Sequence, residues 1–276
     1  MVPEWSTYEW LDDVLITATW SDVAQQWYLP QYSSAVLPWR QVTTEELAKA
    51  IKEGKFSTKD PRFDLFLRMV KETADKAFMK GFAGVKSDTE VARLFVEGKV
   101  AMAWLGTWNV DTLKECQFPY GTTYIPPVSK SESPYEIHDT SYRVGGPSSA
   151  GEYGITKDTA DAGLLPVALD FLMYWSAPQN FQRVYDKYSL FVPMVKGMKP
   201  NPINDEFTYV ASLPERAITD PNGRLSVKYG TEHIRIMQRY LLGEIDIEQT
   251  KAELQKAMDQ AVVELCEQQK WDWCSK

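Results

Sequence analysis

Carboxylates are the most plentiful side chains suited to chemistry in this sequence, with 38 Asp and Glu among 276 residues. Glycoside hydrolysis needs only two of them, about 5–10 Å apart. With so many acidic residues such a pair stays possible, so a glycoside-active enzyme remains an alternative. The patterns G-x-S-x-G and H-E-x-x-H, which mark serine hydrolases and zinc peptidases, do not occur in the sequence. We therefore expect a protein without a catalytic site.

Thiols and imidazoles are too few and too scattered for a metal centre. The sequence has three cysteines and two histidines, and no C-x-x-C pair. This pattern does not fit a Cys/His zinc site, so we expect no metal and no other cofactor. Cys266 and Cys274 are close enough in sequence to close a short terminal loop in an oxidising compartment. General cysteine behaviour favours buried or idle thiols instead, and that is the expectation here.

Aromatic side chains are unusually frequent. Ten Trp, 14 Tyr and 11 Phe make up 13% of the chain. Most of them must fill a core, but Trp and Tyr also suit sugar recognition. The CH-bearing face of a pyranose packs on an aromatic ring, while the indole N–H or phenol O–H remains free for hydrogen bonds.

Four glycines punctuate one stretch, at Gly145, Gly146, Gly151 and Gly154. Their exposed backbone amides would suit either a phosphate or the hydroxyls of a sugar. The spacing fits neither G-x-x-x-x-G-K-[ST] nor G-x-G-x-x-G. The pattern therefore favours hydroxyl groups over phosphate.

Composition and charge exclude several other classes of protein. Hydrophobic residues make up 44% and charged residues 25%, as in soluble globular proteins, and the length suffices for one large domain or two lobes. The net charge of −8 argues against a nucleic-acid partner. No apolar run approaches the roughly 20 residues of a membrane span. The first ten residues lack the basic and apolar regions of a secretory signal peptide.

The spacing of apolar residues predicts a mixed α/β chain with many helices and few strands. One helix should follow Ser87 and end at Gly98. The other expected helices cover residues 8–28, 45–53, 61–79, 166–175, 178–187, 229–242 and 247–269. Strands are expected over residues 100–104, 120–127 and 152–156. Suitable N-caps are Thr43 or Thr44, Asp60, Thr107 and Asp246.

The segment FVEGKVAMAWLGTW, residues 95–108, would give a helix that ends at a glycine, a buried strand, and a Trp near the carboxyl end of that strand. It resembles the pattern F-x-x-G-K-x-A-M-x-x-x-G-x-W of family 1 extracellular solute-binding proteins. The identical positions are Phe95, Gly98, Lys99, Ala101, Met102, Gly106 and Trp108. Open α/β sheets bind ligands at the carboxyl ends of strands. The resemblance implies that Trp108 stacks on a sugar; the alternative is a Trp that only covers the core.

Four further segments resemble the same family in the same order: residues 120–127, 145–157, 168–193 and 242–262. The resemblance implies a helix-rich, periplasmic-binding-protein-like fold of type II with two lobes, similar to maltose-binding protein. It assigns residues 1–125 and 205–276 to the C-terminal lobe and residues 126–204 to part of the N-terminal lobe. Family members are longer and begin with a signal peptide and a βαβα segment, so we expect one lobe to be incomplete.

The resemblance also implies a function. Two lobes would close on a small-molecule ligand, expected to be a sugar, and deliver it to the permease subunits of an ABC transporter. A non-sugar solute is an alternative ligand. The full-length protein would be extracellular or periplasmic and membrane-associated, and an incomplete lobe would favour self-association. The candidate ligand-binding residues are Trp108, Asn109, Gly145, Gly146, Glu152 and Tyr229.

Overall fold

The computed structural model describes residues 16–18, 43–85, 88–105, 109–121, 143–144, 154–188, 195–199, 217–218 and 225–274. Helices predominate among these residues, together with two short pairs of parallel strands. β1 (Ile16–Ala18) pairs with β2 (Met102–Trp104), and β3 (Arg143–Val144) pairs with β4 (Ala217–Ile218). The described part of the chain is therefore α/β and rich in helix.

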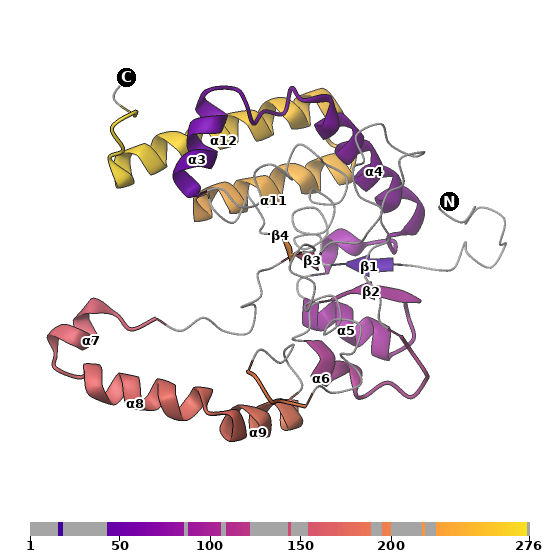
Figure 1. Cartoon of the computed structure of the whole chain (residues 1–276). Coiled ribbons are helices and arrows are strands. Elements are labelled where there is room, and N and C mark those ends of the chain that lie inside the picture. The colour runs from indigo at the N-terminus through magenta and orange to yellow at the C-terminus, as the bar shows by residue number, and fades with distance from the viewer. Residues whose placement is uncertain are drawn as a thin grey trace.

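Four helices from two distant parts of the sequence form the main core. They are α3 (Thr44–Lys52), α4 (Pro61–Ala77), α11 (Val227–Leu241) and α12 (Ile247–Gln269). Figure 1 shows α11 and α12 side by side, with α3 and α4 against them. Each helix buries apolar side chains, among them Leu47, Leu67, Ile236 and Met258. Each such side chain contributes about 1.5–3 kcal/mol when it is fully removed from water.

Polar contacts fix how these helices sit on one another. The Tyr240 hydroxyl of α11 donates a hydrogen bond to the Leu67 carbonyl of α4 at 3.1 Å, in the interior. Lys251 of α12 forms an ion pair with Asp64 of α4 at 2.8 Å. The first bond satisfies a buried polar group, so it specifies one packing of α11 on α4.

Capping boxes begin α3 and α12, at two of the N-caps that the sequence predicts, Thr43 and Asp246. The Thr43 hydroxyl accepts from the Glu46 amide at 3.2 Å, and the Glu46 carboxylate accepts from the Thr43 amide at 2.7 Å. Asp246 and Gln249 make the same exchange at the start of α12. Each box satisfies backbone donors that the helix leaves unpaired. The helices predicted over 45–53, 61–79, 229–242 and 247–269 are confirmed, with small shifts at their ends.

A second group of elements surrounds β1 and β2. It contains α5 (Asp88–Val96), which comes after the 3₁₀ helix η5 (Phe82–Gly84), and α6 (Val110–Leu113). Val91 and Val110 are buried in it. The ring of Phe95 meets that of Phe118 edge to face, with 5.6 Å between centroids. α5 confirms the helix expected between Ser87 and Gly98, and β2 confirms a strand within 100–104. The strand was expected to be buried, but Met102 is 36% exposed.

The helices α7 (Lys157–Asp161), α8 (Leu165–Ser176) and α9 (Pro178–Tyr188) follow one another as an arm away from α11 and α12 (Figure 1). α8 and α9 meet through the rings of Trp175 and Phe181, whose centroids are 6.4 Å apart. Both helices were predicted from sequence.

Two predictions of local structure are wrong. Residues 16–18 are a strand, where a helix over 8–28 was expected. Ile16 and Thr17 are β-branched, and pairing with β2 outweighs the helical periodicity. Residues 154–156 are irregular, where a strand over 152–156 was expected. The last of them, Thr156, caps α7 with its hydroxyl. The strand expected over 120–127 lies outside the described residues except for positions 120 and 121, which are irregular.

Candidate ligand-binding site

The carboxyl edge of the β1–β2 pair is the candidate place for a ligand. The two strands are parallel, and Ala18 lies opposite Trp104 at their carboxyl ends. The chain leaves β2 there and reaches α6 a few residues later. Open α/β sheets bind ligands at this edge because loops from neighbouring strands converge on it. The predicted residues Trp108 and Asn109 belong to this connection.

Asn109 is the member of the predicted site whose placement near this edge is described. It occupies the N-cap position of α6 and is 4% exposed, next to the buried Val110. The sequence predicted this N-cap at Thr107, two residues before its position in the structure. At this exposure little of the Asn109 side chain is accessible to a ligand in this structure, which counts against a ligand role. Its contact with a ligand stays a prediction.

Four other predicted site residues lie outside the described residues: Trp108, Gly145, Gly146 and Glu152. Their neighbours in sequence are informative. Gly145 and Gly146 directly follow β3, which pairs with β4 in parallel. The two glycines thus come, like Trp108, shortly after the end of a parallel strand. Their ligand roles also stay predictions.

Tyr229 lies in the core of α3, α4, α11 and α12. It is 4% exposed, and its ring stacks on that of His233, with 5.7 Å between centroids and 4° between planes. This candidate ligand-binding residue is therefore a packing residue of α11 in this structure. Its ligand role is untested, and the burial of its ring counts against it.

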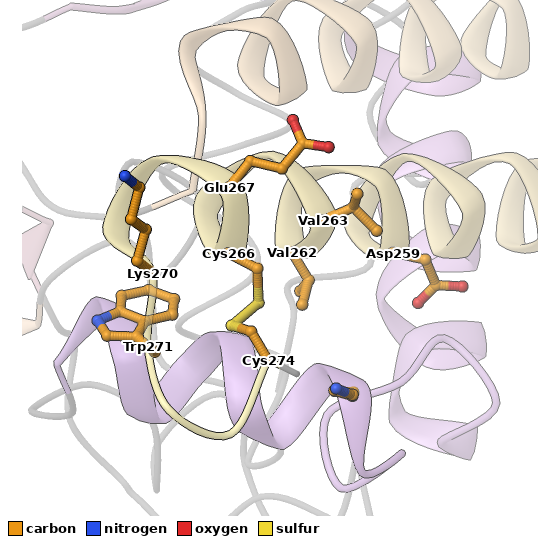
Figure 2. A pocket seen from close by; sticks show the side chains of 9 residues that line it. Asp259, Val262, Val263, Cys266, Glu267, Lys270, Trp271 and Cys274 are labelled. Carbon is orange, nitrogen blue, oxygen red and sulfur yellow. A yellow bond between two sulfur atoms is a disulfide. The ribbon is translucent and has the colours of Figure 1, made fainter. Parts of the chain in front are cut away.

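A pocket of about 720 Å³ lies between α12, the segment that follows it, and α3 (Figure 2). Lys52, Asp259, Glu267 and Trp271 line it, together with both cysteines of the Cys266–Cys274 disulfide. None of the predicted site residues takes part. Aromatic and charged side chains make this pocket a second place where a small molecule could bind. Its lining contains both basic and acidic side chains, so its charge does not favour one class of ligand.

The disulfide corrects the expectation of idle thiols. α12 ends at Gln269, and its C-cap residue Lys270 has a left-handed backbone with φ 54°. This turn reverses the chain and brings Cys274 back to Cys266, with 5.6 Å between their Cα atoms, within the range that a disulfide needs. Sequence alone did not reveal the turn, because a lysine in this conformation is uncommon. The signal that was available is the pair Trp271 and Trp273 beside Cys274, aromatic residues that anchor a terminus.

Two other features are absent from the described residues. No group of three or more His, Cys, Asp or Glu side chains there could hold a metal ion. None of the helices in that part of the chain is long and apolar enough to cross a membrane.

Residues 4–213 match the family model described as bacterial extracellular solute-binding protein. The chain belongs to this family. The match covers most of the sequence and includes β1, β2, the segment 95–108 and the arm formed by α7, α8 and α9. It confirms the class of protein that the sequence pattern indicated. Membership of this family indicates an extracellular or periplasmic location.

Solved structures of binding proteins share the fold. RafE from Streptococcus pneumoniae, in its apo form, is 17% identical with a TM-score of 0.58, over 91% of this chain and 61% of that one. A chitin oligosaccharide binding protein is 15% identical with a TM-score of 0.60, over 92% and 61%. A Streptococcus pneumoniae solute-binding protein in complex with the blood group A-trisaccharide is 13% identical with a TM-score of 0.54, over 90% and 60%.

These likenesses confirm a periplasmic-binding-protein-like fold, rich in helix. The chain spans about three fifths of the length of the solved structures that it matches. No curated protein matches it.

Proposed function

We propose that this protein binds a carbohydrate and acts as the solute-binding component of an ABC transporter. The observation that carries the proposal is the fold it shares with two proteins whose names record oligosaccharide ligands, within a family of solute-binding proteins. The high content of Trp and Tyr supports the same class of ligand, because pyranose rings pack on aromatic faces.

Trp108 is the side chain we assign to the sugar face. It follows β2 in the sequence, and the carboxyl end of β2 lies at the edge where open α/β sheets bind ligands. An indole there supplies apolar area for the CH groups of a pyranose. The Asn109 amide and the Glu152 carboxylate would orient the hydroxyls, and the backbone amides of Gly145 and Gly146 would donate to them.

Binding in this proposal closes two lobes over the ligand. Residues 1–125 and 205–276 form one lobe, and residues 126–204 belong to the other. The ligand stabilises the closed form because it touches both lobes only in that state. The permease subunits recognise the closed form at the membrane surface, with which the full-length protein associates. The ligand leaves unchanged, so the protein is a carrier and not an enzyme.

Self-association through α8 is part of the same proposal. Seven large apolar side chains on and next to this helix are exposed: Leu164, Leu165, Val167, Leu169, Phe171, Met173 and Tyr174. They lie on more than one face of the helix, whereas helices at a protein surface usually have one apolar stripe. Contiguous apolar surface of this kind marks an interaction site.

A panel of ligands tests the proposed function. The chain is titrated with neutral di- to tetrasaccharides, and with glycerol phosphate and a polyamine as non-sugar solutes. We expect saturable binding of at least one oligosaccharide and none of the two non-sugars. Each mixture is also assayed for new reducing ends after prolonged incubation, and none is expected. Binding of a non-sugar alone would contradict the carbohydrate proposal, and release of reducing sugar would show a glycoside-active enzyme.

A further inference from the structure

Residues 271–274 fold back along α3 instead of projecting beyond α12. The backbone N–H of Lys270 donates to the Cys266 carbonyl at 2.9 Å, which closes the final turn of α12. The chain then reverses, and the disulfide joins Cys274 to Cys266. Figure 2 shows this bond connecting α12 to the returning segment, which passes next to α3.

Trp273 connects the returning segment to α3 through three different contacts. Its indole Nε1 donates to the Glu45 carboxylate at 2.9 Å. Its carbonyl accepts from the Lys52 ammonium at 3.3 Å, and that ammonium lies 5.3 Å from the centre of its ring, a cation–π distance. Glu45 and Lys52 stand seven residues apart on one face of α3, so Trp273 spans nearly the whole helix.

Apolar packing supports the same contact. Trp271 stacks on Trp273 with 5.4 Å between ring centroids, and both rings pack against the main core. α3 itself has nine residues. A helix of this length is not stable alone in water, so its order depends on what covers it.

We propose that the Cys266–Cys274 disulfide is a redox-sensitive clamp that holds α3 against α12 through Trp273. The cross-link stabilises the clamped state by limiting the freedom of the terminal segment when that segment is detached. The reversed turn at Lys270 has the opposite effect, because a left-handed backbone is unfavourable for a lysine. Without the cross-link, the contacts of Trp273 alone must offset the conformational entropy that the segment loses and the unfavourable backbone conformation of Lys270.

The clamp also shapes the pocket of Figure 2. Cys266, Cys274 and Trp271 form part of its lining, and Lys52 of α3 forms another part. Opening the clamp removes the wall that the returning segment supplies and exposes the junction of α3 with α12.

A dithiol is the class of reagent that opens the clamp. It transfers two electrons and two protons to the disulfide, which becomes two thiols, while the dithiol becomes a disulfide. Cys116 is a free thiol among the described residues, and desolvation raises its pKa. The raised pKa lowers its thiolate fraction, so Cys116 is a poor competitor in this exchange.

Hydrogen–deuterium exchange on the intact chain tests the proposal, before and after reduction with dithiothreitol. Alkylation should label one cysteine before reduction and three after it. On reduction we expect faster exchange in α3 and in residues 266–274, with little change in α4, and a fall in melting temperature of roughly 5–10 °C. Three labelled cysteines with unchanged exchange in α3 would overturn the clamp, as would three labelled cysteines before reduction.

Two variants separate the clamp from a general effect of thiols. Cys116→Ser should respond to reduction as the wild type does. Trp273→Ala retains the disulfide, and its α3 should exchange faster even when oxidised, because the link between the returning segment and α3 is gone. If α3 exchanges in Trp273→Ala as slowly as in the oxidised wild type, the clamp does not act through Trp273 and the proposal fails.

Discussion

His233 is a buried imidazole in the middle of α11, 2% exposed and stacked on Tyr229. Burial lowers its pKa from 6.5 to about 4, because protonation would place a charge in an apolar interior. Its Nδ1 has no hydrogen-bond partner among the described residues. The protein therefore keeps this histidine neutral at physiological pH.

The burial of His233 makes stability depend on pH in a defined direction. Its pKa is lower in the folded state than in the unfolded state, so the unfolded state takes up the proton first as pH falls. The free energy of unfolding is not reduced by this histidine above pH 6.5. It falls as the pH drops from 6.5 towards 4, because the unfolded state binds the proton and the folded state does not. By pH 5 the loss is about 2 kcal/mol of unfolding free energy.

Urea unfolding at pH 7.5 and pH 5, for the wild type and His233→Gln, measures this loss. The variant cannot take up a proton at this position, so its stability should fall by about 2 kcal/mol less between the two pH values. Carboxylates titrate in both proteins and cancel in the comparison. Equal losses in the two proteins would show that His233 does not titrate as its burial requires.

The candidate site residues rest on sequence signals of different strength. Trp108 was found from a pattern of fixed positions around a strand, a local signal. Tyr229 was a candidate without a local motif around it, and the structure places its ring in the core. His233, one helical turn after Tyr229, was a signal that the two rings share the inner face of α11.

Among the elements, helices with their own start and stop signals were predictable. Thr43 and Asp246 have acceptor side chains at the right positions, so α3 and α12 begin where the sequence indicates. β1 was missed because its three residues are a strand only through their pairing with β2, far away in the sequence. The returning segment after α12 was missed because it depends on one left-handed residue and a disulfide.

The exposed apolar surface of α8 predicts self-association. Phe171 is 56% exposed on this helix. A charge at this position should disfavour burial of the surface between two copies, because an unpaired carboxylate is costly to remove from water. We therefore expect Phe171→Glu to shift the protein towards the monomer.

Light scattering over a range of protein concentrations measures this shift. The wild type should gain mass as concentration rises, and Phe171→Glu should do so much less. Val263→Glu is the matched control, since Val263 is 57% exposed on α12, and it should behave as the wild type. A wild type that stays monomeric at all concentrations would contradict self-association through α8.

At the scale of the whole molecule, the class of protein was predictable and the assembly of the chain was not. Seven fixed positions within residues 95–108 indicated the family, and the family match over residues 4–213 confirms it. The main core joins residues 44–77 to residues 227–269. Such long-range packing depends on all the segments together, so no local sequence pattern predicts it. The assignment of residues to two lobes stays a prediction for the same reason.

Binding of an oligosaccharide at the β1–β2 edge is tested most directly by titration calorimetry. The best sugar of the panel is titrated into the wild type, Trp108→Ala and Trp271→Ala. Trp271 lines the pocket beside the disulfide, so its variant separates the two candidate places. Loss of a stacking indole should weaken binding by at least about thirtyfold in Trp108→Ala, and Trp271→Ala should bind as the wild type does. Unchanged affinity in Trp108→Ala, or loss of binding only in Trp271→Ala, would contradict a sugar site at the strand edge.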